Sequence, residues 1–197
     1  MPTAAVTDGR TARSQRTRTA VVDALLALLG DGNPRPTARE IAEKAGVSLR
    51  SVYVHFDDLD DLFVAAAERQ LHVVLGMVVE VPSTGPLADR VSTLMRVRGR
   101  IYEKVGPVRR AAERQEPFSP TLARTMRAVR RATRDELARV FATELGPADT
   151  TSYEHRLTML DAMTAGSTWD HLRASGMDVA QARRATTDVV VVFLERQ

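Results

Sequence analysis

The chain has 197 residues, a formal net charge of +3, 44% hydrophobic and 27% charged residues, and no cysteine. This composition is typical of a globular protein with one or two domains. It excludes disulfides, thiolate metal sites and a cysteine nucleophile. No apolar run reaches the roughly 18 residues that span a bilayer, and the N-terminus lacks the apolar core of a signal peptide, so we expect a cytoplasmic protein with no membrane partner.

The first thirty residues divide into a polar segment and a helix. Residues 1–12 are small and polar, which predicts a disordered arm. Arginines at and beyond its end, such as Arg13 and Arg16, either meet nucleic-acid phosphates or are solvated, and the sequence leaves both open. Apolar residues at helical spacing from Val21 to Leu29 predict a helix over 13–29.

Residues 37–56 predict two short helices joined by a tight turn. Thr37 and Glu40 have the spacing of a capping box. Gly46 accepts the left-handed conformation that ends a helix, and Ser48 is a good N-cap for a second helix that runs to Phe56. Such a pair is typical of a helix-turn-helix motif, whose second helix enters the DNA major groove. An ordinary helical hairpin would carry the same caps, so this pattern alone leaves both interpretations open.

The second of these helices carries the side chains that DNA recognition needs. Arg50 can donate two hydrogen bonds to a guanine edge, and Leu49 or Val54 can contact a thymine methyl group. Hydroxyl and ring donors nearby can bond phosphate oxygens. The predicted DNA-contacting residues are Thr37, Arg39, Ser48, Leu49, Arg50, Ser51, Tyr53, Val54 and His55.

The order of residues in this segment resembles the N-terminal domain of the TetR (tetracycline-repressor) family of transcriptional regulators. The family pattern, roughly T-x-x-x-I-A-x-x-A-G-V-S-x-x-[ST]-x-Y-x-[HY]-F, is met by Thr37, Ile41, Ala42, Ala45, Gly46, Val47, Ser48, Ser51, Tyr53, His55 and Phe56. The resemblance implies a three-helix DNA-binding domain over residues 13–60, with a C-terminal helical domain for ligand binding and dimerisation over residues 61–197.

One position departs from that family pattern. The family usually has a lysine three residues after the phenylalanine, where it touches the DNA backbone, but this chain has Leu59 there. The resemblance therefore implies that one phosphate contact is lost. Four aspartates surround Leu59 in the run DDLDD. They would repel DNA if they faced it; we favour the alternative that they stabilise the positive N-terminus of the next helix.

Apolar spacing predicts six further helices, near 58–81, 87–105, 107–116, 122–145, 151–175 and 178–197, and hence an all-α fold of about nine helices. Gln70 lies within an apolar stripe and needs a partner, either a ligand or a backbone group. Arg98 borders another stripe and could reach a pocket, which flexible methionines would suit as walls. The candidate ligand-binding residues are Gln70, Met95, Arg98, Tyr102, Met126, Met159 and Met163. For each methionine and for Tyr102, plain core packing is the competing interpretation, and the one we favour.

The last predicted helix ends in six consecutive apolar residues, 189–194. One side of that turn would lie in water in a monomer, whereas a second subunit would bury it. In the TetR family the last two helices form the dimer, and the sequence W-x-x-L-R from Trp169 to Arg173 looks similar to the family's pattern there. The predicted homodimer interface comprises Trp169, Val189, Val190 and Phe193.

Motifs for catalysis are missing from the sequence. The four histidines lack metal-binding spacing, and there is no P-loop, dinucleotide fingerprint or nucleophile elbow. The DDLDD run lacks the glycine and the final glutamate of a calcium loop. We therefore expect no enzyme, no catalytic residue, no metal and no cofactor.

The resemblance implies a dimeric regulator of transcription. It would bind a palindromic double-stranded DNA operator and be released by a small-molecule effector, most simply as a repressor. Two alternatives remain open: a small-molecule-binding dimer whose DNA binding is lost or weakened, and an activator with the same DNA-reading head.

Overall fold

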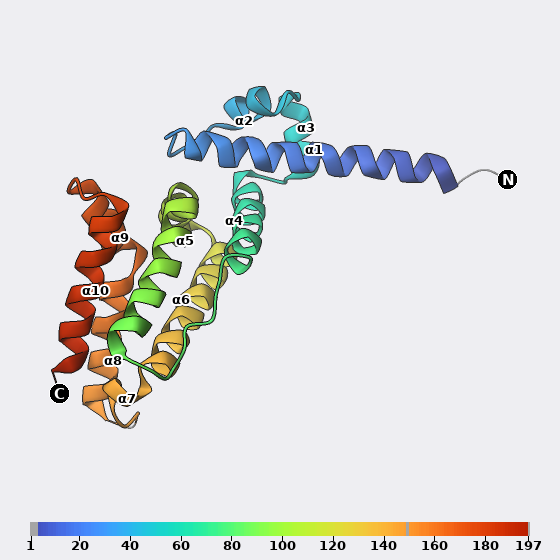
Figure 1. Cartoon of the computed structure of the whole chain (residues 1–197). Helices are drawn as coiled ribbons and strands as arrows, with labels where there is room; N and C mark the ends of the chain where they lie inside the picture. The colour runs from blue at the N-terminus through green and yellow to red at the C-terminus, as the bar shows by residue number, and fades with distance from the viewer. Residues whose placement is uncertain (1–3, 149, 197) are drawn as a thin grey trace. The chain divides into compact units, whose positions relative to one another are not determined.

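The computed structural model describes residues 4–148 and 150–196, and over these ranges the chain is all helical, as predicted (Figure 1). Its elements in chain order are α1 (Ala4–Gly30), α2 (Ala38–Ala45), α3 (Leu49–His55), α4 (Leu59–Leu75), α5 (Leu87–Gln115), the 3-10 turn η1 (Glu116–Phe118), α6 (Pro120–Val140), α7 (Ala142–Leu145), α8 (Thr151–Thr164), α9 (Gly166–Ala174) and α10 (Val179–Glu195). Within the described ranges no helix is both long and apolar enough to cross a bilayer.

Two predicted helix boundaries near the N-terminus differ from the structure. α1 begins at Ala4 rather than near Arg13, and the strong helix formers of the added segment include Ala4, Ala5 and Ala12. Only residues 1–3 of the arm that was predicted to be disordered lie outside the described residues. α4 ends at Leu75 rather than near 81, because Gly76 and two valines follow, all of them poor helix formers.

Two further differences concern proline and a chain bend. Pro107 was predicted to start a new helix, but α5 continues through it. A proline removes one backbone hydrogen bond of a helix. The other backbone hydrogen bonds of this 29-residue helix are sufficient to continue it through Pro107. The predicted helix over 151–175 is instead two helices, because Ala165 takes an extended conformation with ψ of 155° between α8 and α9.

The described chain forms two compact units. Unit 1 comprises residues 1–73 and 107–124, and unit 2 comprises 74–106 and 125–197. Unit 1 is larger than the DNA-binding domain predicted over 13–60, since it also holds most of α4 and the segment 107–124. The division falls inside α4, α5 and α6, and of these three points only the one in α5, at Gly106 and Pro107, has a sequence that marks a break.

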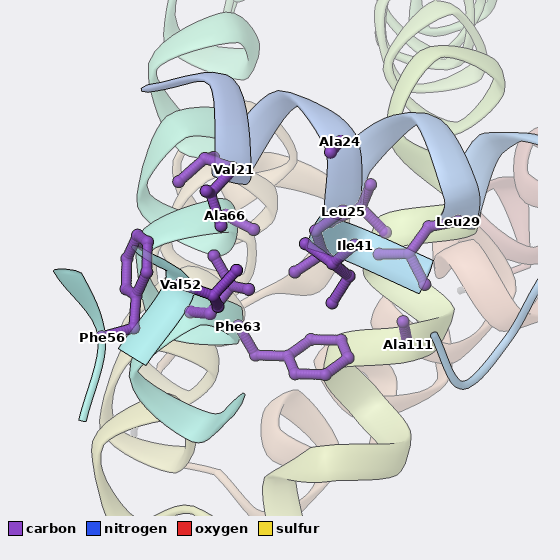
Figure 2. Close-up of a cluster of buried hydrophobic side chains, with 14 of the residues drawn as sticks. Val21, Ala24, Leu25, Leu29, Ile41, Val52, Phe56, Phe63, Ala66 and Ala111 are labelled. Atoms are coloured by element: carbon purple, nitrogen blue, oxygen red, sulfur yellow. The ribbon is translucent and has the colours of Figure 1, made fainter. Parts of the chain in front are cut away.

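The core of unit 1 holds α3 in place. Apolar side chains from α1, α2, α3 and α4 meet there, joined by Val108 and Ala111 from α5 (Figure 2). α3 contributes the fully buried Val52, and Phe56 follows directly after the helix, four residues on. Because residues four apart lie on one face of a helix, this anchoring leaves the opposite face of α3 free.

The core of unit 2 is centred on Trp169 from α9. Its indole packs against Gly99 of α5, and its Nε1 donates to Glu103 at 2.8 Å. A buried ion pair between Arg90 and Glu144 lies elsewhere in this unit. Burial acts to raise the pKa of Glu144, but the hydrogen bonds and charge of Arg90 outweigh it, so the pKa of this carboxyl is lowered.

Candidate nucleic-acid interface

The start of α2 is fixed by the predicted capping box. Thr37 Oγ1 accepts from the Glu40 N–H at 3.3 Å, and Glu40 Oε2 accepts from the Thr37 N–H at 2.7 Å. The Thr37 hydroxyl also donates to that same carboxylate oxygen at 2.7 Å. The hydrogen bond from the Thr37 backbone, followed by that from its side chain, lowers the pKa of the Glu40 carboxyl.

The turn between α2 and α3 has the geometry that the sequence predicted. Gly46 lies at φ 67°, a conformation that favours glycine. Its N–H donates to Glu43 O at 3.2 Å, and the Val47 N–H donates to Ala42 O at 3.0 Å, which together close the end of α2. Ser48 Oγ then accepts from the Ser51 N–H at 3.1 Å and caps α3. These bonds set the direction in which α3 leaves the turn.

α3 presents large side chains to solvent. Leu49 is 43% exposed, Tyr53 51% and Val54 70%, and Arg50 beside them is also exposed. These large side chains lie close together on one seven-residue helix, and a contiguous exposed patch of this kind is typical of an interaction surface. In size and composition this face suits the edges of bases in a major groove.

The structure divides the predicted DNA-contacting residues into two groups. Arg39, Arg50, Tyr53 and His55 have no hydrogen-bond or ion-pair partner in the described part of the chain, so their donors are available. The hydroxyls of Thr37, Ser48 and Ser51 are instead engaged in the helix caps. The sequence could not separate the groups, because a good N-cap residue is also a good phosphate donor.

The acidic run between α3 and α4 caps a helix, which is the role we favoured. Asp58 Oδ1 accepts from the Asp61 N–H at 2.9 Å, and Asp61 Oδ2 accepts from the Asp57 N–H at 3.3 Å. Asp60 Oδ2 accepts from the buried Ser119 hydroxyl at 2.7 Å. The carboxylates of Asp58, Asp60 and Asp61 are therefore tied into unit 1.

The arginines of α1 also differ from one another. The guanidinium carbon of Arg18 lies 4.7 Å from the ring centroid of Phe56, which holds this side chain against unit 1. Arg13 and Arg16 are exposed. Of Arg13, Arg16 and Arg18, the first two therefore keep the freedom that contact with phosphates would need.

A cleft beside α3 contains functional candidates that the sequence reasoning missed. It has a volume of about 400 Å³ and lies within unit 1. Its lining, here called the Tyr53 cleft, consists of Pro34, Arg35, Pro36, Thr37, Ala38, Tyr53, Leu59, Phe63, Ala111, Arg114 and Gln115. Arg114 was missed because it lies far along the chain from Tyr53, and Arg35 because it lies in a predicted loop between two prolines. No sequence pattern links them.

Arg98, a candidate ligand-binding residue, is bound by the protein itself. Its Nη1 donates to Thr164 Oγ1 at 2.7 Å, and its Nη2 donates to Thr133 O and Glu136 Oε2, each at 3.1 Å. The Tyr102 hydroxyl donates to Thr164 O at 2.8 Å. Arg98 thus joins α5, α6 and α8 within unit 2.

The other ligand-binding candidates lie in different settings. Met95 is buried in the core of unit 2, whereas Met126 and Met163 are partly buried and Met159 is exposed. Gln70 belongs to unit 1, and its Oε1 is buried with no hydrogen-bond partner in the described structure. Met95, Tyr102 and Met163 thus belong to one cluster of unit 2, and Arg98 and Tyr102 both bond Thr164, whereas Gln70 lies in unit 1.

Two of the four predicted interface residues need correction. Trp169 and Val190 are buried in the core of unit 2 of the single chain. They have almost no exposed surface that a second copy of the chain could contact. Both follow apolar spacing, which marks a core position and an interface position alike. Val189 is exposed, as is its neighbour Val192, whereas Phe193 is partly buried with the Arg156 guanidinium 5.6 Å from its ring.

The sequence and the fold of this chain resemble those of known regulatory proteins. Residues 21–66 match the model of the bacterial regulatory proteins of the tetR family. A transcriptional regulator from Rhodococcus sp. Rha1 superposes with a TM-score of 0.67 at 23% identity, covering 92% of this chain and 96% of that one. A tetR-family transcriptional regulator from Streptomyces coelicolor superposes with a TM-score of 0.69 at 23% identity, over 91% and 79% of the two chains.

A third similar structure is the multidrug binding protein EbrR in complex with imidazole. Its TM-score is 0.65 at 21% identity, over 89% of this chain and 88% of that one. No curated protein sequence matches the chain significantly. The family match covers the capped helix pair with its exposed α3, and the similar structures share the all-helical fold. The family match and the sequence resemblance therefore agree: residues 21–66 match the tetR family of bacterial regulatory proteins.

Proposed function

We propose that this protein is a cytoplasmic, homodimeric regulator of transcription that binds a palindromic operator and is released from it by a small molecule. The observation that carries the proposal is the exposed face of α3. Leu49, Arg50, Tyr53 and Val54 all face solvent on a short helix whose buried side is fixed in the core. The proteins similar in fold include two transcriptional regulators, and a regulator needs no catalytic group.

DNA recognition follows from the roles of the side chains on this face. With α3 in the major groove, Arg50 donates two hydrogen bonds to a guanine, and Val54 or Leu49 packs on a thymine methyl group. Tyr53, His55 and Arg39 have free donors for phosphate oxygens, and such contacts set the register of the helix rather than the choice of sequence.

Dimerisation would present two copies of α3 to one palindrome. Support comes from exposed apolar side chains on two adjacent helices of unit 2, which are Met159 on α8 and Val189 and Val192 on α10. We propose that these side chains, rather than Trp169 and Val190, belong to the subunit interface. Burial of exposed apolar surface is the driving force.

The effector would act from unit 2. One protein of similar fold is a multidrug binding protein, which supports a small-molecule site in this fold. Partly buried side chains such as Tyr102, Met126 and Met163 are our candidates for its walls, with Arg98 holding the surrounding helices together. An effector releases DNA only if it binds the DNA-incompetent state more tightly, since equal affinity for both states shifts nothing.

One observation favours a second candidate function, a small-molecule-binding dimer with weakened DNA binding. Leu59, at the start of α4, is uncharged and packs against the core of unit 1. That position therefore offers no cation to a phosphate.

A mobility-shift assay with genomic DNA fragments at modest salt separates the two functions. Retention of specific fragments supports the regulator, and no retained fragment at micromolar protein supports the alternative. Arg50→Ala then tests whether the exposed face of α3 recognises bases. We expect it to weaken binding to the retained fragment by about 1–3 kcal/mol and to relax base preference at one position of each half-site. Unchanged base preference would show that Arg50 does not read the operator.

A further inference from the structure

We propose that the Tyr53 cleft is a second DNA contact, in which Arg35 and Arg114 bind a phosphate of the operator backbone. This inference rests on the proposed function. It adds a phosphate site whose two arginines lie outside α3. It assigns a role in DNA binding to the end of α5, which lies outside the family's matched segment, residues 21–66.

The charge in the cleft is of one sign. Arg35 and Arg114 are the charged side chains among its lining residues, and no carboxylate is among them. Both side chains are exposed, and neither has a hydrogen-bond or ion-pair partner within the described residues. Glu40 does not line the cleft, but its carboxylate bonds the lining residue Thr37. That carboxylate already accepts from the Thr37 N–H and hydroxyl. Two unpaired guanidinium groups at one cleft attract an anion.

Both arginines extend from stiff backbone. Arg35 lies between Pro34 and Pro36, which restrict its backbone, and its N–H donates to Asn33 Oδ1 at 3.1 Å. Arg114 lies in the last turn of the 29-residue helix α5. The entropy lost on binding is therefore confined to the two side chains. Guanidinium groups match phosphate geometry through two parallel hydrogen bonds each.

The cleft shares residues with the DNA-reading helix. Tyr53 lies both on the exposed face of α3 and in the cleft lining, and its hydroxyl is free in the described structure. A strand whose bases are read by Arg50 and Val54 must continue past Tyr53. The lining also includes the apolar side chains of Leu59, Phe63 and Ala111, and apolar surroundings weaken the screening of an ion pair formed in the cleft.

These contacts would raise affinity for all DNA sequences alike. Each phosphate contact changes the slope of log K against log salt by about 0.9. Because both arginines bind one phosphate, each single variant should lose part of this slope, and replacing both should reduce the slope of a dimer complex by about 1.8. The slope of log K against log salt should fall equally for specific and for non-specific DNA. Replacing Arg50, by contrast, should change the base preference.

The test measures DNA affinity by fluorescence anisotropy over a series of KCl concentrations, with a fragment that the wild-type protein retains and with an unrelated duplex. Arg114→Gln and Arg35→Gln are each compared with Arg124→Gln, an exposed arginine of α6 in the same unit whose side chain bonds Thr121. We expect a reduced slope for the first two variants on both DNAs, and an unchanged slope for the control. Thermal melting checks that each variant is folded.

A rescue variant separates charge from structure. Arg114→Lys keeps a cation at the same position of the cleft. It should retain most of the slope that Arg114→Gln loses. Wild-type binding with an unchanged slope in both arginine variants would overturn this inference alone. No DNA binding by the wild type would overturn the proposed function as well. Calorimetric binding of inorganic phosphate that Arg114→Gln abolishes, with no change of slope, would show a small-anion site and overturn the DNA contact.

Discussion

Replacing Gly99 with alanine should destabilise unit 2, although alanine is the better helix former. A Cβ at residue 99 would lie 2.8 Å from Trp169 Cη2 and 3.2 Å from Cζ3. The indole cannot easily move away, because it is buried and its Nε1 donates to Glu103. Tyr102 also confines it, with the two ring centroids 6.2 Å apart. The added methyl group must therefore displace α5 or strain the indole.

Two effects of opposite sign decide the size of the change. Overpacking a filled core costs about 1–3 kcal/mol. Replacing a glycine inside a helix with alanine returns about 0.5–1 kcal/mol. The free energy of unfolding should therefore fall, by at most about 2.5 kcal/mol. Gly30→Ala is the matched control, since a Cβ added there, at the end of α1, would have no atom within 4 Å.

Urea unfolding followed by the fluorescence of Trp169, the single tryptophan, measures this change. All variants are compared at one protein concentration, because the stability of the proposed dimer would depend on concentration. We expect a lower midpoint for Gly99→Ala and an unchanged or higher midpoint for Gly30→Ala. A Gly99→Ala protein as stable as the wild type would refute the reasoning that the indole is held rigidly over α5.

Two further predictions concern the interface and the α2 cap. Val192→Asp places a charge at an exposed position of α10, so the subunit should stay folded while the dimer dissociates; an unchanged sedimentation coefficient would remove α10 from the interface. The lowered pKa of Glu40 means that its cap stabilises the fold fully above the ordinary glutamate value of 4.5 and is lost as pH falls through the folded value. The advantage of the wild type over Glu40→Gln in urea should therefore shrink on acidification, and an advantage that grew in acid would contradict this sign.

The helix-turn-helix geometry could be predicted from the sequence because its interactions are local. The bonds between Thr37 and Glu40, the left-handed Gly46 and the Ser48 cap each join residues no more than five positions apart. The same holds for the aspartates at the start of α4. Spacing alone also indicated that Val52 faces inward, and hence which face of α3 points out.

Burial and pairing in the rest of the chain were decided by contacts between residues far apart in sequence. Trp169 and Val190 follow the same apolar spacing as an interface, but they are enclosed by their own subunit. Arg98 is bound by groups on α6 and α8, so what resembled a pocket residue is a structural one.

The Tyr53 cleft shows the same distinction most clearly. Its lining brings Arg114 from α5 beside Tyr53 from α3, and nothing in either segment alone indicates the other. The sequence by itself determined the caps, the turn and the exposed face of α3, because hydrogen bonds and side-chain spacing within a few residues specify them. Only the tertiary structure decided which polar side chains remain free, because that depends on which distant groups the folded chain brings within hydrogen-bonding distance.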